Sequence, residues 1–349
     1  MILLTADIHA HNFTDFNSPT KKGRNSRLMA IMGAMQRMLD YGNKHDAKDF
    51  VIIGDLFHSQ TKIDVDVVSE VSSMLYDIKG CGIDVTIICG NHDQYLRDGS
   101  CNSVSQFRGI ANVVTEPKIV HLNDAILFAV PYIDDQEKLQ DALDQMALHA
   151  KGIKENTTIL GAHLAVDGSF VGSFEYQVKT HVGLKNLHTS AYSLVFLGHH
   201  HKPQELDEGV YYVGSPVQHD KGERGETKVF WAVNADGAVE TIPTEAPEFK
   251  RLTKDEYGEL SEEERKKVYP EVIVNSLDEH KELVKSTSGE NVQITLEDST
   301  VERESRIKFD EGDSHKDKIK KYVEFAVDEH MHDTAQFTRV GIQLLEEVL

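Results

Sequence analysis

The chain has 349 residues, of which 40% are hydrophobic and 27% charged, and its formal net charge is −21. This composition is typical of a globular protein long enough for one large and one smaller domain. The acidic balance argues against a polycation that coats nucleic acid, but it allows a nuclease whose positive potential comes from metal ions. No apolar run approaches the ~20 residues of a membrane span, so no membrane association is expected.

The N-terminus shows no secretory signal, because Met1-Ile2-Leu3-Leu4 runs directly into polar residues. The three cysteines, Cys81, Cys89 and Cys101, have no Cys-x-x-Cys spacing. Both features predict reduced thiols and a cytoplasmic protein.

Three apolar runs in the first hundred residues each end in a polar cluster. The runs at residues 1–6, 50–53 and 85–89 lead into Asp7-Ile8-His9, Gly54-Asp55-Leu56-Phe57-His58 and Gly90-Asn91-His92-Asp93. Helical patterns at 28–42 and 65–78 separate the runs, so the segment is β-α-β-α-β and predicts a largely parallel sheet. One such cluster is also what an ordinary polar turn looks like. Three of them at one sheet edge favour a ligand site.

The middle of the chain supplies histidines at further strand ends. A strand at 158–162 ends at His163, and one at 193–197 ends in Gly198-His199-His200-His201. In extended backbone His199 and His201 face one side and His200 the other, which predicts two ligands from this cluster. Strands are also expected at 211–213, before Gly214-Ser215-Pro216, and as a hairpin at 229–233 and 239–242.

After Pro243 the composition changes. A linker is expected at 244–247, residues 245–267 are charged and helix-prone, and short strands are expected at 272–274 and 292–296. Helical spacing returns at 319–348, where an apolar stripe consists of Phe337, Val340, Gly341, Leu344, Leu345 and Val348. Such a stripe either packs on its own domain or docks on a partner.

The side chains at the strand ends form a set of metal ligands. The candidates are Asp7, His9, Asp55, Asn91, His163, His199 and His201. Carboxylate, amide and imidazole donors without a thiolate suit Mn²⁺, Fe²⁺ or Zn²⁺ and disfavour Ca²⁺. Seven donors exceed the needs of one ion and suit two ions ~3.5–4 Å apart that share a carboxylate. His92, not needed as a ligand, is a candidate acid for a leaving oxygen.

In this order and placement the motifs resemble the calcineurin-like metallophosphoesterase superfamily. Within it the chain is most similar to the SbcD-type nuclease subunit of double-strand-break repair nuclease–ATPase complexes, on the residues Ala6-Asp7-Ile8-His9, Gly54-Asp55-Leu56-Phe57-His58, Gly214-Ser215-Pro216 and Phe249-Lys250-Arg251-Leu252. The resemblance covers residues 1 to about 243, and the rest only by position and pattern. It implies an α/β fold, a β-sandwich flanked by helices, with a small α+β cap domain and a C-terminal helical segment. The corresponding domains are 1–243, 244–312 and 313–349.

The resemblance also implies roles for the candidate residues. Asp7, His9, Asp55 and His201 would hold one manganese ion, and Asp55, Asn91, His163 and His199 the second, with Asp55 as the bridge. His92 would be the acid at the leaving group, Asp93 its orienting partner, and His58 a residue that affects nuclease action near the metals. Mg²⁺ is a further alternative to Mn²⁺. The sequence departs from the family at Ala10-His11, where Leu-Gly is usual, and this puts the approach of the substrate in doubt.

The implied function is a Mn²⁺-dependent DNA exonuclease or endonuclease for recombination and DNA repair. Its partners would be DNA, an SbcC-like ATPase with a coiled coil, and a second copy in a homodimer. The compact size is similar to phage versions, which act in the cytoplasm of a bacterium or an infected host. Two alternatives stay open, because the motifs bind phosphate and not DNA: a phosphomonoesterase or cyclic-nucleotide phosphodiesterase, and a metal-bound scaffold that only clamps DNA ends.

Overall fold

The computed structural model describes residues 1–18, 20, 23–153, 156–172, 176–287 and 291–297, and in addition 314, 317–318 and 320–321. The chain divides into two units, Met1–Thr295 and Leu296–Leu349. The two large sheets and the helices that cover them lie in the first unit. The domain boundaries expected after residues 243 and 312 stay predictions, and the apolar stripe at 337–348 lies outside the described residues.

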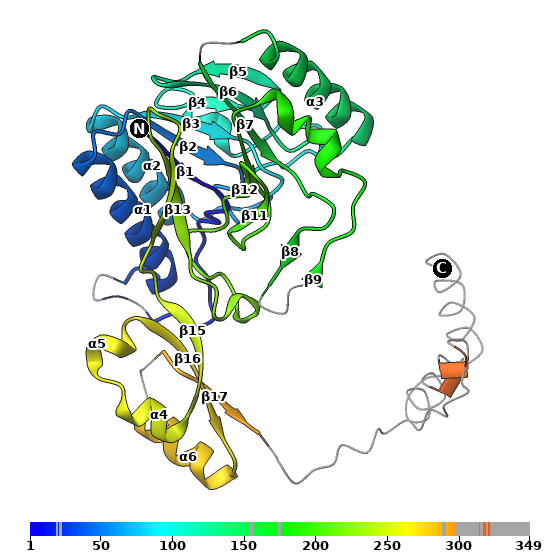
Figure 1. Ribbon diagram of the computed structural model, residues 1–349. Coiled ribbons are helices and arrows are strands. Elements are labelled where there is room, and N and C mark those ends of the chain that lie inside the picture. The colour runs from blue at the N-terminus through cyan, green and yellow to red at the C-terminus, as the bar shows by residue number, and fades with distance from the viewer. Residues whose placement is uncertain are drawn as a thin grey trace. The chain divides into compact units, whose positions relative to one another are not determined.

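Two six-stranded sheets form the larger part of this unit (Figure 1). The first has the order β14-β13-β1-β2-β3-β4, with β1 (Ile2–Thr5), β2 (Asp49–Ile53), β3 (Asp84–Ile88), β4 (Asn112–Val114), β13 (Val229–Val233) and β14 (Val239–Pro243). The second has the order β11-β12-β10-β7-β6-β5, with β5 (Lys118–His121), β6 (Ala125–Val130), β7 (Thr157–His163), β10 (Leu194–Gly198), β11 (Gln204–Asp207) and β12 (Val210–Tyr212). Strands β1, β2 and β3 pair in parallel, as the sequence predicts; β4 also pairs in parallel with β3, and β13 joins β1 antiparallel.

Three helices cover the outer faces of the sheets. Helices α1 (Ser26–Lys44) and α2 (Val65–Gly80) lie on the first sheet, and α3 (Gln136–Ala150) lies on the second (Figure 1). Successive side chains of β1 point to opposite faces of the first sheet. Leu3 lies in the apolar cluster with α1 and α2, whereas Leu4 lies in the cluster between the two sheets, together with Phe196. The helix-flanked α/β sandwich expected from the sequence is confirmed.

The polypeptide after Pro243 forms a smaller layer, which we call the cap. Its sheet has the order β15-β16-β17, with β15 (Glu248–Thr253), β16 (Val268–Val274) and β17 (Gln293–Leu296), and its helices are α4 (Lys254–Glu259), α5 (Glu262–Arg265) and α6 (Leu277–Ser286). The helix expected across 245–267 is wrong for the first residues of that range, because Glu248–Thr253 form strand β15. Strand β15 pairs in parallel with β16 and buries Phe249, while its charged side chains stay on the outside.

The remaining elements are short. They are the hairpin β8 (Phe170–Val171) and β9 (Tyr176–Gln177), and 3-10 turns at Val104–Phe107, Leu184–Leu187, Thr189–Ala191 and Lys221–Glu223. Among the helices that the structure describes, none has the length and apolar content to cross a bilayer.

Candidate metal centre

The polar clusters lie together because the carboxyl ends of five strands meet there. The loop after β1 runs beside the loop after β2, since the amide of Asp7 donates to Gly54 O at 3.1 Å and that of His9 to Asp55 O at 2.9 Å. Two glycines permit the close approach. A methyl group on Gly54, whose φ is +84°, would overlap the imidazole of His163, and one on Gly90 would overlap the Asp55 carboxylate.

The backbone at this edge is strained. Asp7, His9, Asp55 and His199 have φ values of 50°, 47°, 52° and 99°, in the left-handed region that non-glycine residues rarely adopt. Asp7 and His9 lie beyond the end of β1 at Thr5, so they are not part of an extended strand. The side chains converge through left-handed turns. Strain of this kind gathers at functional sites.

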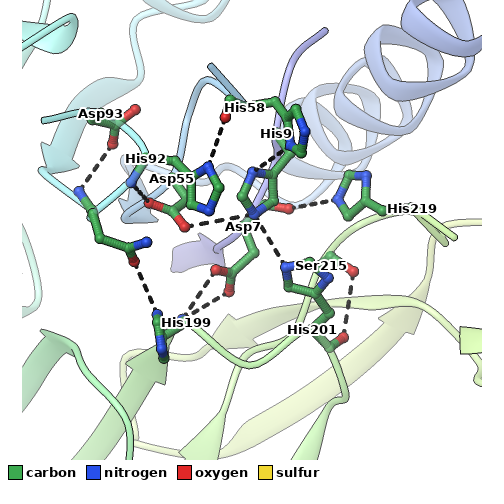
Figure 2. Close-up of polar contacts among 12 residues, drawn as sticks. Asp7, His9, Asp55, His58, His92, Asp93, His199, His201, Ser215 and His219 are labelled. Atoms are coloured by element: carbon green, nitrogen blue, oxygen red, sulfur yellow. Dashed lines mark hydrogen bonds and ion pairs between the residues drawn. The ribbon is translucent and has the colours of Figure 1, made fainter. Parts of the chain in front are cut away.

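The candidate ligands fall into two groups, and Figure 2 shows Asp7, His9 and His201 of one with Asp55 and His199 of the other. The first consists of Asp7, His9 and His201, and the second of Asp55, His163 and His199; within each group the ligand atoms lie within 4.8 Å of one another. In the first group, His9 Nε2 and His201 Nε2 are 3.1 Å apart. Imidazole nitrogens this close, beside a buried carboxylate, are what a divalent cation requires.

Asp55 lies between the two groups. Its Oδ2 is 3.5 Å from His9 Nε2 and 3.4 Å from His163 Nε2. Its Oδ1 accepts the backbone N–H of His92 at 2.8 Å. One oxygen is thus held by the protein and the other faces both groups, which is the position that a shared carboxylate needs.

Asn91 and the three consecutive histidines complete the second group. The side-chain oxygen of Asn91 is 3.0 Å from His163 Nε2 and 3.0 Å from His199 Nδ1. His200 turns away and packs on Tyr212, with ring centroids 4.7 Å apart. The structure therefore brings the seven candidate ligands together and leaves out His200.

Other protein groups orient two of the imidazoles. His163 Nδ1 lies 2.9 Å from the carbonyl oxygen of Ile53, so it carries the hydrogen and leaves Nε2 for a metal. His201 Nδ1 lies 2.7 Å from Glu223 Oε1, which fixes its ring in the same way. Partners of this kind raise the basicity of metal-binding histidines.

Glu223 and His219 were not predicted from the sequence. Glu223 is buried and also pairs with Lys228, Nζ to Oε2, at 2.7 Å. His219 Nε2 lies 2.9 Å from the carbonyl oxygen of Asp7 and so donates to it. Both residues follow the Gly-Ser-Pro turn without a motif of their own. The only signal was a histidine and an acid placed shortly after that turn.

The candidate catalytic residues have different surroundings. His92 Nδ1 lies 2.6 Å from the carbonyl oxygen of His58 and donates to it, which leaves Nε2 for proton exchange. His92 packs edge-on against His9, with ring centroids 4.7 Å apart, and His58 Nδ1 is 3.4 Å from His9 Nδ1. His58 and His92 thus both border the first ligand group.

Asp93 does not take the place expected for an orienting partner of His92. Its carboxylate is fully buried and accepts the backbone N–H groups of Leu56, Phe57 and Gly90 at 3.3, 3.1 and 2.9 Å. The ring of His92 is oriented by the carbonyl of His58 instead. Asp93 thus ties the loop after β2 to the loop after β3 and holds the backbone that carries Asp55.

The electrostatics of the metal-free chain suit cation binding. Burial and the neighbouring imidazoles lower the pKa of His9 well below 6.5 and that of His199 to about 3, so both rings are neutral, the form that binds metals. Burial raises the pKa of Asp7 to about 6. Although burial opposes it, the nearby Asp55 raises the pKa of His163 to about 9, so this ring holds a proton that a cation would displace.

Three comparisons show which known proteins the chain resembles. The family model described as calcineurin-like phosphoesterase matches residues 1–203. No curated protein gives a significant match. Among solved structures, a dimetal phosphatase from Danio rerio is similar at 11% identity and TM-score 0.40, covering 66% of this chain and 91% of its own. The nuclease MPE of Pseudomonas putida is similar at 17% identity and TM-score 0.26, covering 50% and 66%. Such distant likenesses say nothing about the substrate of this chain.

Proposed function

This chain belongs to the calcineurin-like phosphoesterase family, and on that premise we propose that it is a two-metal phosphodiesterase that cleaves DNA as the nuclease subunit of an SbcCD-like recombination and repair complex. The observation that carries the proposal is the position of Asp55. One of its carboxylate oxygens faces His9 of the first ligand group and His163 of the second. A carboxylate in this position suits two adjacent cations on one phosphate.

The donor set fits divalent ions of intermediate softness. Each group combines one buried carboxylate with two imidazoles, and the second group adds the oxygen of Asn91. Mn²⁺ is the proposed native metal, with Fe²⁺, Zn²⁺ and Mg²⁺ as alternatives. When bound, such a pair neutralises charge on the phosphate and supplies a water of lowered pKa.

The protein groups then perform the remaining tasks. His92, with Nδ1 held by the carbonyl of His58, gives the proton on Nε2 to the leaving oxygen. Asp93 keeps the loops that carry Asp55 and His92 in register through three backbone amides. His58, stacked on His92 at 5.5 Å, shapes the side from which the leaving group departs.

The cap supports DNA over a small phosphomonoester as the substrate. It contacts the loop that carries His219 and Glu223, because the amide of Phe249 donates to Gln218 Oε1 at 2.7 Å. Glu271 of β16 pairs with Lys221 at 3.0 Å and with Arg224 at 2.8 Å. A layer fixed beside the centre in this way suits a long substrate whose path must be guided.

Residues 313–349 belong to the proposal as the segment that docks on the coiled coil of an SbcC-like ATPase, within a homodimeric complex in the cytoplasm. The support is the apolar stripe in the sequence. Phe337→Asp combined with Leu344→Asp should abolish co-purification with the ATPase while the basal nuclease activity persists. Loss of the thermal transition in this variant would make the stripe part of a core and contradict the docking role.

The test of the proposed function uses blunt duplex DNA and p-nitrophenyl phosphate side by side, with Mn²⁺, in the presence and absence of the cognate ATPase. We expect metal-dependent cleavage of the DNA that exceeds hydrolysis of the monoester. Rapid hydrolysis of the monoester with intact DNA would instead favour the phosphomonoesterase alternative. DNA binding without any hydrolysis would favour the scaffold.

A further inference from the structure

A cavity of about 280 Å³ opens beside the first ligand group. Its walls include Phe13, Phe16, His58, His201, His219 and Phe249. Because His201 is a candidate ligand and His58 borders the same group, a phosphate held there would direct one of its substituents into this cavity. The volume lies just below the range of pockets for drug-sized ligands, which begins at about 300 Å³.

Aromatic rings that pack on one another form part of the cavity wall, and the polar residues Thr14, Asp15, Arg27, Asp220 and Lys221 form the rest. The ring of Phe13 lies 5.1 Å from that of His58 and 5.8 Å from that of His219, centroid to centroid. On the cap side, Phe249 packs against Phe16 at 5.2 Å. The guanidinium of Arg27, which also lines the cavity, lies 4.9 Å from the centroid of Phe13 and 5.0 Å from that of Phe249 and so contacts both rings. Rigid rings of this kind suit a flat, aromatic ligand.

One residue of the cavity wall, His219, has a ring nitrogen without a hydrogen-bond partner among the described residues. His219 is 7% exposed, and its Nε2 donates to the carbonyl of Asp7. Nδ1 is therefore an acceptor, and it is buried without a hydrogen-bond partner among the described residues. Such an atom costs free energy unless a ligand or a water donates to it. Any of the four nucleobases can do so, because each carries at least one N–H on its edge.

We propose that this cavity is a base-binding subsite that receives the nucleobase attached to the phosphate at the metal centre. The inference rests on the proposed function and adds to it the recognition of a single unstacked base. Phe13 and Phe249 contact the ring faces, and His219 Nδ1 accepts an N–H from the base. Recognition through a ring face and one general donor fits a nuclease that accepts any sequence.

The test measures the binding of small phosphates to the full Mn²⁺-loaded chain by calorimetry, with the integrity of each phosphate checked by phosphorus NMR. The probes are deoxyadenosine 5′- and 3′-monophosphate, 2-deoxyribose 5-phosphate, which lacks a base, and purine deoxyriboside 5′-monophosphate, whose base has no N–H donor. One of the two deoxyadenosine phosphates should bind about 5- to 100-fold more tightly than deoxyribose phosphate. The purine nucleotide should bind several-fold more weakly than deoxyadenosine 5′-monophosphate if that isomer is the tighter one.

Variants then locate the base. Phe13→Ala should bring the ratio between the affinities for the nucleotide and for deoxyribose phosphate close to one. Phe13→Tyr should preserve that ratio. Phe13→Leu keeps the volume and loses the ring, so a reduced ratio in a variant with an unchanged melting temperature assigns the effect to stacking. Tyr95→Ala, at an exposed aromatic residue outside the cavity, is the matched control and should keep the wild-type ratio.

Three results overturn the subsite. If deoxyribose phosphate and both nucleotides bind the wild-type chain with equal affinity, the base does not enter the cavity. That result would not contradict the proposed metal centre. If the nucleotide preference survives in both Phe13→Ala and Phe13→Leu, the base lies elsewhere. Failure of every phosphate, inorganic phosphate included, to bind the Mn²⁺-loaded chain would overturn the proposed function together with the subsite.

Discussion

The hydrogen bond between Glu223 and His201 gives the sharpest test of how the metal centre is supported. Glu223→Gln keeps the size of the side chain and an acceptor oxygen, but it removes the charge that faces His201 Nδ1 at 2.7 Å. Burial alone would raise the pKa of Glu223, yet His201 and Lys228 hold it below its usual range, so the carboxylate is charged in the folded chain. The substitution therefore changes the electrostatics of one ligand with little change in packing.

The expected magnitude follows from the place of Glu223 behind a metal ligand. Loss of such a partner typically weakens metal binding 10- to 100-fold, which is about 1.4–2.7 kcal/mol. The loss should fall on the ion held by Asp7, His9 and His201. The fold should persist, because Lys228 keeps its second partner, Glu226, at 2.7 Å. Mn²⁺ titration followed by electron paramagnetic resonance should resolve one weakened and one unchanged site.

Glu271→Gln is the matched control. Glu271 also pairs with two basic side chains, Lys221 and Arg224, but within the part of the chain that the structure describes its carboxylate bonds to no histidine. Its replacement should leave both metal affinities at their wild-type values. Equal metal affinities in Glu223→Gln and the wild type would refute the view that this carboxylate supports a metal ligand.

Three further outcomes are expected. His92→Asn should lower turnover about 10²- to 10⁴-fold while metal analysis still finds both ions, and loss of an ion would make His92 a ligand instead. Arg27→Met should lower the free energy of unfolding by about 2–4 kcal/mol, because the buried guanidinium donates to the carbonyls of Asp15, Gln218 and His219; denaturant melts measure this, and an unchanged midpoint would contradict it. Because His163 has a pKa of about 9 in the metal-free chain, Mn²⁺ must displace its proton, and the affinity for Mn²⁺ should rise from pH 7 to pH 9. Calorimetry in buffers of different ionisation enthalpy should detect the released proton. An affinity for Mn²⁺ that does not change with pH would contradict this prediction.

The strand ends could be predicted because their signals are local. Each apolar run that stops at a glycine and a polar cluster marks a buried strand and its loop, and parallel pairing then puts the clusters at one edge. Asp7, Asp55 and Asn91 were found in this way. The left-handed backbone at Asp7 and His9 could not be found, because it depends on hydrogen bonds to the neighbouring loop at Gly54 and Asp55.

Other features were missed for identifiable reasons. Glu223 and His219 act through tertiary contacts with His201 and Asp7, and nothing in their local sequence shows these partners. Strand β15 was missed because its charged side chains conceal one buried residue, Phe249. The elements β4, β5, β6 and α3 were not predicted either, although the apolar run Ala125–Val130 is a readable strand signal.

Metal content per chain tests the central claim most directly, because the account depends on one carboxylate shared by two ions. Native mass spectrometry of the Mn²⁺-loaded wild-type chain should find two ions. Asp55→Ala should retain neither, because its Oδ2 faces both His9 and His163, whereas His9→Ala should lose chiefly one. One tightly bound ion remaining in Asp55→Ala would contradict the shared centre.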